Sequence, residues 1–394
     1  MVVISDRKNM PDRYRIRADM LYPGGGMPPL PDRLVEIEVG RIVGIREAGA
    51  GDVDAGFDIV APGFIDLQIN GAGGVMFNDS PDTPTIERIV AAARIGGTCH
   101  LLPTYITASG SGYRDAMAAV AAWTGPEILG VHLEGPFLSP EKPGIHPAEY
   151  IRQPNDEDMA LLLAHRGRIL ITLAPEEMEA GTMQTLADGG LILFAGHSNA
   201  SCGAVLGAAE RGLRGITHLF NACSQITSRE PGVVGAAFAD RRLAAGIIAD
   251  GFHVAPRNLR LAHELMKGRL FLVSDTMPTF GSDITSFTIG AETITLDHGR
   301  LTSRDGRLAG AHLGLDRAVR LMVDDAGIDL ADALHMASGI PAEVLGLEDQ
   351  FGTVAVGRSA SLTCLNSGLE AEAVIVDGTL FRNESGNSRY GGSS

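Results

Sequence analysis

The middle of this chain repeats one pattern eight times, a short apolar run followed in most repeats by a segment with helical periodicity. The apolar runs lie at residues 63–67, 98–102, 128–132, 169–173, 191–195, 215–218, 246–249 and 270–274. Helical patterns include residues 85–95, 200–211, 258–267 and 314–326. Parallel strands that are buried on both faces read as continuous apolar runs, and eight of them alternating with helices are typical of a (β/α)8 barrel. We therefore expect an α/β fold with a TIM-like barrel over residues 61–346.

An open, doubly wound parallel sheet is the alternative architecture for such a repeat. Sheets of that kind often carry a G-x-G-x-x-G turn after the first strand. The glycine-rich segment after the first run, residues 71–74, does not have this spacing. The barrel is therefore the favoured interpretation.

Both ends of the chain have a different, strand-like character. Apolar and polar residues alternate at residues 14–18 and 34–39, and the pattern returns at 361–365 and 373–378. Chain ends often lie close together in a folded protein. We therefore expect a small β-sandwich domain built discontinuously from residues 1–60 and 347–394.

Composition and charge exclude several classes of function. The chain has 394 residues, 45% of them hydrophobic and 20% charged, which is ordinary for a globular protein. Its net charge of −16 would repel nucleic acid and anionic membranes, so we expect neither as a partner. A small anionic substrate is still compatible with this charge, because it needs only a local basic pocket.

The four cysteines and the chain start bear on the cellular compartment. Cys99, Cys202, Cys223 and Cys364 are scattered without a C-x-x-C spacing, so we expect reduced thiols and no disulfide framework. The start of the chain lacks the apolar core of a signal peptide, and no stretch has the apolar length of a membrane span. We expect a cytoplasmic protein.

Polar side chains follow the apolar runs at the points where the predicted strands end. The third run leads into His132 and Glu134, the fifth into His197, the sixth into His218 and the eighth into Asp275. In a barrel these ends line one shared mouth. One carboxylate and two imidazoles from three strands, with an open position, make a hydrolytic metal site. A single histidine is more often structural, but three such residues at equivalent strand ends favour a site.

The remaining polar residues near these ends have weaker signals. Asp275 suits a general base, which takes a proton from water and later gives it to a leaving group; its alternative role is a helix N-cap. His132 lies two residues before Glu134, so both project from the same face of one strand. His100 lies early in its run, and we expect it to be structural.

Seven motifs at and beyond these strand ends carry a resemblance. They are APGFIDLQINGAGG (61–74), HLEGPF (132–137), GIHP (144–147), GHSNAS (196–201), THLFNAC (217–223), REPG (229–232) and VSDTMP (273–278). Together they resemble the N-acetylglucosamine-6-phosphate deacetylase family of the metal-dependent amidohydrolase superfamily. The resemblance runs nearly from end to end and includes GTVAVGRSASL (352–362), which in the family closes the small β domain.

The resemblance implies a role for each matching residue. Glu134, His197 and His218 would bind one divalent metal ion per subunit, zinc ahead of iron or another divalent metal. Asp275 would activate the attacking water and then protonate the departing amine. His146, in GIHP, would polarise the acetamide carbonyl or hold the substrate.

The sugar and its 6-phosphate would be held by a second set of residues. By resemblance these are Asn221, Ala222, Arg229 and His253, and the family commonly supplies the last two from a neighbouring subunit. We therefore expect a homodimer. An arginine together with backbone donors is also what a phosphate dianion needs chemically.

Several positions depart from related patterns. The superfamily often has His-x-His on the first strand, where this chain has Gln68 and Asn70, and the fourth strand offers no lysine to bridge two metals. Both absences favour a single tightly bound metal. The loop at 223–228 reads CSQITS where the family usually has more proline and histidine. His312 replaces a small hydroxyl residue; it contacts substrate or an extra metal, or else belongs to a repacked loop.

The expected reaction is hydrolysis of N-acetylglucosamine 6-phosphate to glucosamine 6-phosphate and acetate, in amino-sugar catabolism or recycling. Two alternatives stay open. The first keeps the chemistry and changes the substrate to N-acetylgalactosamine 6-phosphate or another N-acyl amino sugar. The second is a metal-free sugar-phosphate binding protein on the same barrel.

Overall fold

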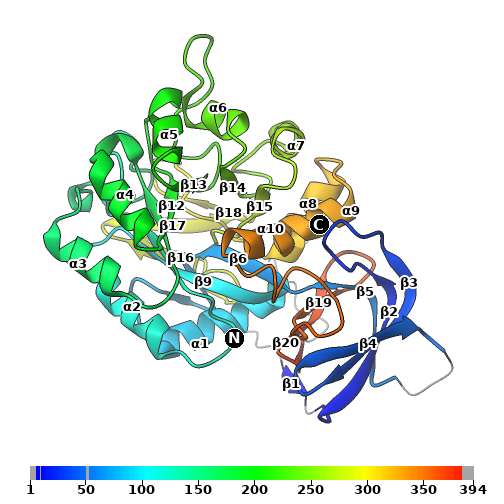
Figure 1. Cartoon of the computed structure of the whole chain (residues 1–394). Helices are drawn as coiled ribbons and strands as arrows, with labels where there is room; N and C mark the ends of the chain where they lie inside the picture. Colours follow the sequence, from blue (N-terminus) through cyan, green and yellow to red (C-terminus); the bar gives the residue numbers. More distant parts are fainter. Residues whose placement is uncertain (1–5, 9, 50–52, 384–394) are drawn as a thin grey trace.

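The computed structural model describes residues 6–8, 10–49 and 53–383, and a parallel barrel forms its centre (Figure 1). The eight strands lie in the order β15-β14-β13-β12-β11-β10-β9-β6. They are β6 (Phe64–Ile69), β9 (Thr98–Ile106), β10 (Val131–Glu134), β11 (Ile169–Leu173), β12 (Ile192–Ala195), β13 (Leu213–Ile216), β14 (Ala244–Ile247) and β15 (Leu270–Leu272). The two ends of the sheet meet just beyond β15, where Thr276 bridges to Ile69. The barrel is thus nearly closed, and all eight predicted runs overlap its strands.

Helices surround the barrel and bury their apolar faces against it. They are α1 (Thr83–Ala93), α2 (Tyr113–Ala122), α3 (Asp156–Ala164), α4 (Ala180–Asp188), α5 (Cys202–Ala209), α6 (Gly232–Ala239), α7 (Pro256–Leu265), α8 (Leu315–Asp324), α9 (Leu330–Ala337) and α10 (Gly339–Val344). Short 3-10 turns follow at η1 (Arg94–Gly96), η2 (Ala148–Tyr150) and η3 (Pro175–Glu177). Local sequence marks the start of α3, where Asn155 and Asp158 form a capping box that satisfies backbone N–H groups left unpaired in the first turn.

The two ends of the chain combine in one small β domain, as the sequence predicts, and its strands form a single mixed sheet. Its order is β1-β21-β20-β19-β5-β2-β3-β4, with β2 and β5 parallel. The strands are β1 (Asp6–Lys8), β2 (Arg13–Leu21), β3 (Leu30–Glu38), β4 (Arg41–Glu47), β5 (Ala55–Pro62), β19 (Leu362–Leu365), β20 (Ala371–Val376) and β21 (Thr379–Arg382). They are linked in a single sheet around a core of their own, with Ile16 and Phe57 from one end and Leu362 and Ile375 from the other.

His100 lies where this β domain meets the barrel. Its Nδ1 donates to the carbonyl of Pro126 at 2.8 Å, so its Nε2 accepts from the Ser361 hydroxyl at 2.9 Å. Burial lowers the pKa of His100 to about 4. Both nitrogens are satisfied by neutral groups, which is the arrangement of a structural histidine.

A small antiparallel sheet covers part of the carboxyl end of the barrel and was not among the expected elements. Its strands are β16 (Ser286–Ile289), β17 (Glu292–Asp297) and β18 (Arg300–Thr302), and a shorter pair, β7 (Gly71–Ala72) and β8 (Val75–Met76), follows β6. Ile289, Ile294 and Leu301 pack against Ile106 and Met277 beside the barrel mouth. The strands bury so few residues that no clear apolar pattern marks them. No helix among the described residues has the length and apolar character needed to cross a membrane.

Candidate active site

A cavity of about 440 Å³ opens at the carboxyl ends of the barrel strands. Its wall includes Glu134, His146, His197, His218, His253 and Asp275. Every one of these residues was a candidate from the sequence. This end of a barrel is where strand-end side chains converge.

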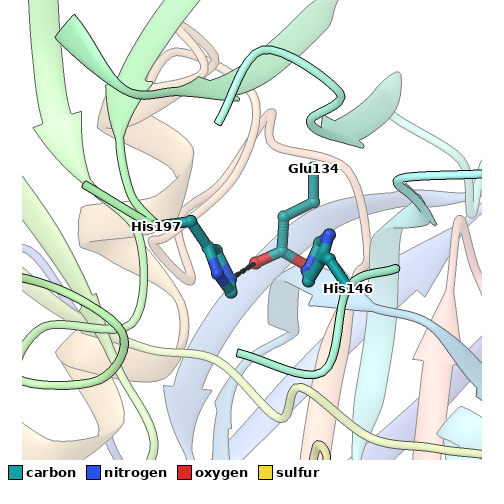
Figure 2. A group of neighbouring side chains, drawn as sticks. All are labelled: Glu134, His146 and His197. Carbon is teal, nitrogen blue, oxygen red and sulfur yellow. Dashed lines mark ion pairs between the residues drawn. The ribbon is translucent and has the colours of Figure 1, made fainter. Parts of the chain in front are cut away.

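Glu134 is the centre of the cluster, at the last position of β10 and almost fully buried. Its Oε1 lies 2.9 Å from Nε2 of His218 and 3.2 Å from Nε2 of His197. Its Oε2 lies 3.8 Å from Nε2 of His146. Figure 2 shows the carboxylate between the imidazoles of His146 and His197. Burial alone would raise the pKa of Glu134, but its contacts with the imidazoles of His197 and His218 hold it well below its usual range.

The tautomer of His197 makes this convergence unusual. Its Nδ1 donates to the carbonyl of Lys142 at 2.9 Å, so in the neutral ring the Nε2 lone pair faces Glu134. The Nε2 atoms of His197 and His218 are also only 3.1 Å apart. The Nε2 lone pair of His197 and the Glu134 carboxylate thus converge on Nε2 of His218, and a cation placed between the three atoms would satisfy all of them.

The spacing of these three atoms fits a divalent metal ion. Their separations of 2.9, 3.1 and 3.2 Å are close to the edge of about 3.3 Å between ligands in a tetrahedral site with bonds near 2.05 Å. His146 is a rival for the third position, since Glu134, His146 and His197 also offer ligand atoms within 4.8 Å of one another. We favour His218 because its nitrogen lies closer to both shared partners. His146 instead holds Thr107, with Nδ1 2.9 Å from the hydroxyl oxygen.

The backbone is strained at three of the converging residues. His197, His218 and Asp275 have φ values of 47°, 31° and 48°, in the left-handed region that non-glycine residues seldom adopt. Such strain concentrates at functional sites. Here it turns the side chains at the ends of β12, β13 and β15 toward the cavity.

Asp275 lies beside the cluster and is held by two amides. Asn70 donates to its Oδ1 at 2.7 Å, and Gln68 donates to the same oxygen at 3.1 Å while bridging to Glu134 at 3.2 Å. Burial first, and the negative charge of Glu134 second, raise the pKa of Asp275 to about 6. Gln68 and Asn70 thus orient a carboxylate.

Asn221, Ala222 and His253 also lie on the wall of this cavity. His253 is fixed by Asp250, whose Oδ2 lies 2.7 Å from Nδ1 of the ring. Burial of Asp250 works against ionisation, but the hydrogen bond from the His253 ring and those from the backbone N–H groups of Phe252 and His253 together outweigh it and lower the Asp250 pKa. A ring held in this way points its other nitrogen at a fixed position.

Arg229, His132 and His312 do not line the cavity. Arg229 is exposed on the connection between β13 and α6, which projects from the barrel (Figure 1). His132 is buried below the site, with Nε2 2.8 Å from Oγ1 of Thr172, and burial lowers its pKa to about 4. His312 lies 3.0 Å from the hydroxyl of Thr279. Within one chain, the remaining residues that the sequence analysis proposed for the site lie together at or beside the cavity.

Sequence reasoning did not find three residues that shape the cavity. Thr107 orients His146, and Lys142 and Arg307 are the lysine and arginine on the wall. Arg307 donates to the carbonyl of Gly144 at 2.8 Å and to Glu292 at 3.1 Å, tying the His146 loop to β17. Among the contacts that support cavity residues, the sequence indicates one: Asp250 and His253 lie three residues apart after β14.

Known proteins resemble this chain over most of its length. The model of the amidohydrolase family matches residues 59–381. The chain is 40% identical to an N-acetylgalactosamine-6-phosphate deacetylase of Shewanella sp. (strain ANA-3), over 81% of this chain and 82% of that one. The crystal structure of N-acetylglucosamine-6-phosphate deacetylase from Pasteurella multocida is similar with a TM-score of 0.89 and 32% identity, covering 94% of this chain and all of that one.

A second solved structure carries a ligand. It is a mutant of the Mycobacterium smegmatis N-acetyl-D-glucosamine-6-phosphate deacetylase in complex with N-acetyl-D-glucosamine 6-phosphate. Its TM-score to this chain is 0.87 at 28% identity, covering 94% of this chain and 99% of that one.

Proposed function

This chain belongs to the amidohydrolase family, and we propose that it removes the acetyl group of an N-acetylated amino-sugar 6-phosphate by metal-dependent hydrolysis. The observation that carries the proposal is the convergence of Glu134, His197 and His218 beside Asp275 at the barrel mouth. The proposal also draws on relatives and solved structures that are deacetylases of this substrate class.

Glu134, His197 and His218 would hold one divalent metal, with zinc favoured by the nitrogen-rich set of ligands. Bound there, the metal would supply a Lewis acid and lower the pKa of a water molecule. Gln68 would keep the Glu134 carboxylate in place through its 3.2 Å hydrogen bond. The hydrogen bond from His197 to the Lys142 carbonyl would keep Nε2 unprotonated and available as a ligand.

Asp275 would move the protons. Its Oδ1 is held by Asn70 and Gln68, which leaves Oδ2 to accept a proton from the attacking water and return it to the departing amine. A carboxylate with a pKa of about 6 suits both steps near neutral pH. His146, oriented by Thr107, would donate from Nε2 to the acetamide carbonyl oxygen as negative charge develops on it.

The 6-phosphate would bind where the cavity is most basic. His253 and Lys142 lie on the wall, and Asn221 and Ala222 flank them. Arg229 lies on the projecting connection and would complete the phosphate site from a neighbouring subunit of a homodimer. Mixing Arg229→Ala with Asp275→Asn tests this arrangement: activity recovered in mixed dimers supports an arginine acting across the interface, and no recovery contradicts it.

Two sugar epimers compete as the substrate. The family motifs led us to N-acetylglucosamine 6-phosphate, whereas the 40% identity to an N-acetylgalactosamine-6-phosphate deacetylase favours the galacto epimer as a second candidate. An acetate-release assay on both phosphates, with metal content known, compares their kcat/KM values. Equal values would remove any claim of selectivity. Equal turnover of unphosphorylated N-acetylglucosamine would remove the phosphate site.

A metal-free binding protein would use the same barrel without catalysis. That function predicts the loss of a ligand or of the base, and this chain keeps Glu134, His197, His218 and Asp275. Metal analysis of the purified protein separates the two functions. Sub-stoichiometric divalent metal, with no gain of activity on adding zinc, would favour the binding protein.

A further inference from the structure

A second cavity lies at the opposite, amino end of the barrel. Its volume is about 570 Å³, against about 440 Å³ for the catalytic cavity. The wall is formed where β11 to β15 begin and by the last turn of α10 and the residues after it. The proposed deacetylation makes no use of this end.

Four arginines line the second cavity and make its wall basic. Arg168 precedes β11, Arg214 is the second residue of β13, Arg242 lies two residues before β14, and Arg269 precedes β15. Glu343 is the acidic side chain on the same wall. A local excess of positive charge in a chain of net charge −16 attracts anions to one place.

Two of the arginines have structural roles. Arg269 donates from Nη1 to the carbonyls of Ala237 and Leu243, both at 2.6 Å. Arg242 binds the carboxylate of Asp240 with two nitrogens, Nε at 3.0 Å and Nη2 at 2.6 Å. These contacts join loops at the bottom of the barrel.

The other two arginines have guanidinium groups available for a ligand. The Arg168 side chain donates from Nε to the carbonyl of Leu345 at 3.2 Å, and its two terminal nitrogens have no hydrogen-bond partner among the described residues. The Arg214 side chain forms no hydrogen bond or ion pair with any other residue in the described part of the chain. Planar guanidinium groups whose terminal nitrogens have no protein partner are suited to bidentate binding of phosphate.

We propose that this arginine cavity binds a phosphorylated sugar, separately from the catalytic site. Arg168 and Arg214 would hold phosphate, and the apolar side chains of Leu191, Ile192 and Val344 would contact the sugar. Strand β12 lies between β11 and β13, so the two arginines start about 10 Å apart. They can converge on one phosphate or take one each from a bisphosphate.

Calorimetric titration with glucose 6-phosphate and with fructose 1,6-bisphosphate tests the proposal on the full-length protein. The double variant Arg168→Gln/Arg214→Gln should bind the tighter probe at least about tenfold more weakly than the wild type, because each lost contact is a charge-assisted hydrogen bond. Glu343→Gln should bind it more tightly, since a negative charge leaves the wall. Acetate release by the double variant without probe should stay within about twofold of the wild type.

Two controls separate this site from other anion binding. Arg260→Gln/Arg320→Gln removes the same charge from surface ion pairs with Glu264 and Glu370 and should leave probe affinity unchanged. Arg229→Gln, in the phosphate site of the proposed deacetylase, should also leave the affinity for this cavity unchanged. Wild-type affinity in the Arg168→Gln/Arg214→Gln variant, or no saturable binding of either probe to the wild type, would overturn the proposal and leave the deacetylase function untouched.

Discussion

Buried histidines occur in two regions of this protein, and their surroundings differ. At the seam between barrel and β domain, His100 has both ring nitrogens satisfied, by a carbonyl and by a hydroxyl. At the barrel mouth, His197 and His218 bring their Nε2 atoms within 3.1 Å of each other and within 3.2 Å of one Glu134 oxygen. Burial is nearly complete in both regions.

Burial alone therefore does not identify a functional histidine. A histidine with two neutral partners is complete, and adding a cation would break its hydrogen bonds. A histidine whose second nitrogen converges with another acceptor leaves a position that a cation can fill. Partner chemistry therefore distinguishes the proposed metal ligands from the structural histidine.

Removing one histidine from each region tests this contrast directly. His197→Gln should lose bound metal and lower kcat on the order of 10³-fold, because Lewis-acid stabilisation is worth several kcal/mol and each factor of ten is about 1.4 kcal/mol. His100→Gln should keep the metal and near-normal kcat. Metal analysis and initial rates on both variants measure the contrast, and equal metal loss in the two would contradict it.

Asp275→Asn tests whether the mouth holds a base as well as a metal. The variant should keep metal and substrate while kcat falls on the order of 10²–10⁴-fold, the usual contribution of general acid–base catalysis. Asparagine preserves the size of the side chain, so Gln68 and Asn70 lose only their charged acceptor. A near-normal kcat with full metal content would take this role away from Asp275.

His146→Asn distinguishes the two candidates for the third ligand. If His218 is the ligand, the His146 variant keeps its metal and loses on the order of 10²-fold in kcat, the effect of removing one donor to a developing oxyanion. His218→Asn is the matched variant and should lose the metal. Loss of metal in the His146 variant with retention in the His218 variant would reverse the assignment.

The fold followed from the sequence wherever burial was complete. Each barrel strand is covered on both faces, so each appears as an apolar run, and residues 169–173 match β11 without error. The sheet of β16 to β18 was missed because Ile289, Ile294 and Leu301 are the buried residues of its three strands. An element that buries one side chain per strand leaves too little pattern to recognise.

The catalytic candidates followed from topology, since a barrel brings its strand ends together whatever their distance in the chain. No comparable rule predicts which residues of two loops come into contact. Arg307 binds the carbonyl of Gly144 across 163 positions of sequence. His132 and Glu134 share one strand face, but only Glu134 reaches the mouth, because inward side chains in a barrel stack in layers and His132 belongs to the layer below.

The smallest expected effect is the acid sensitivity of the structural histidine. Burial holds the pKa of His100 at about 4 in the folded protein, against about 6.5 in an unfolded chain. Between these values the unfolded chain binds a proton that the folded protein does not, so stability falls as pH drops from about 6.5 to about 4. The full loss from this one group is about 3 kcal/mol.

His100→Gln cannot take up that proton, so its stability should change less between pH 7 and pH 4.5 than that of the wild type. At neutral pH the variant should be less stable by about 1–2 kcal/mol, because the glutamine replaces two buried hydrogen bonds imperfectly. Urea unfolding at a series of pH values measures both effects. His298→Gln is the matched control: that side chain is 94% exposed, so its removal should leave the pH dependence unchanged. If His100→Gln keeps the wild-type acid slope, the proton is taken up elsewhere and the seam histidine is not the acid-sensitive group.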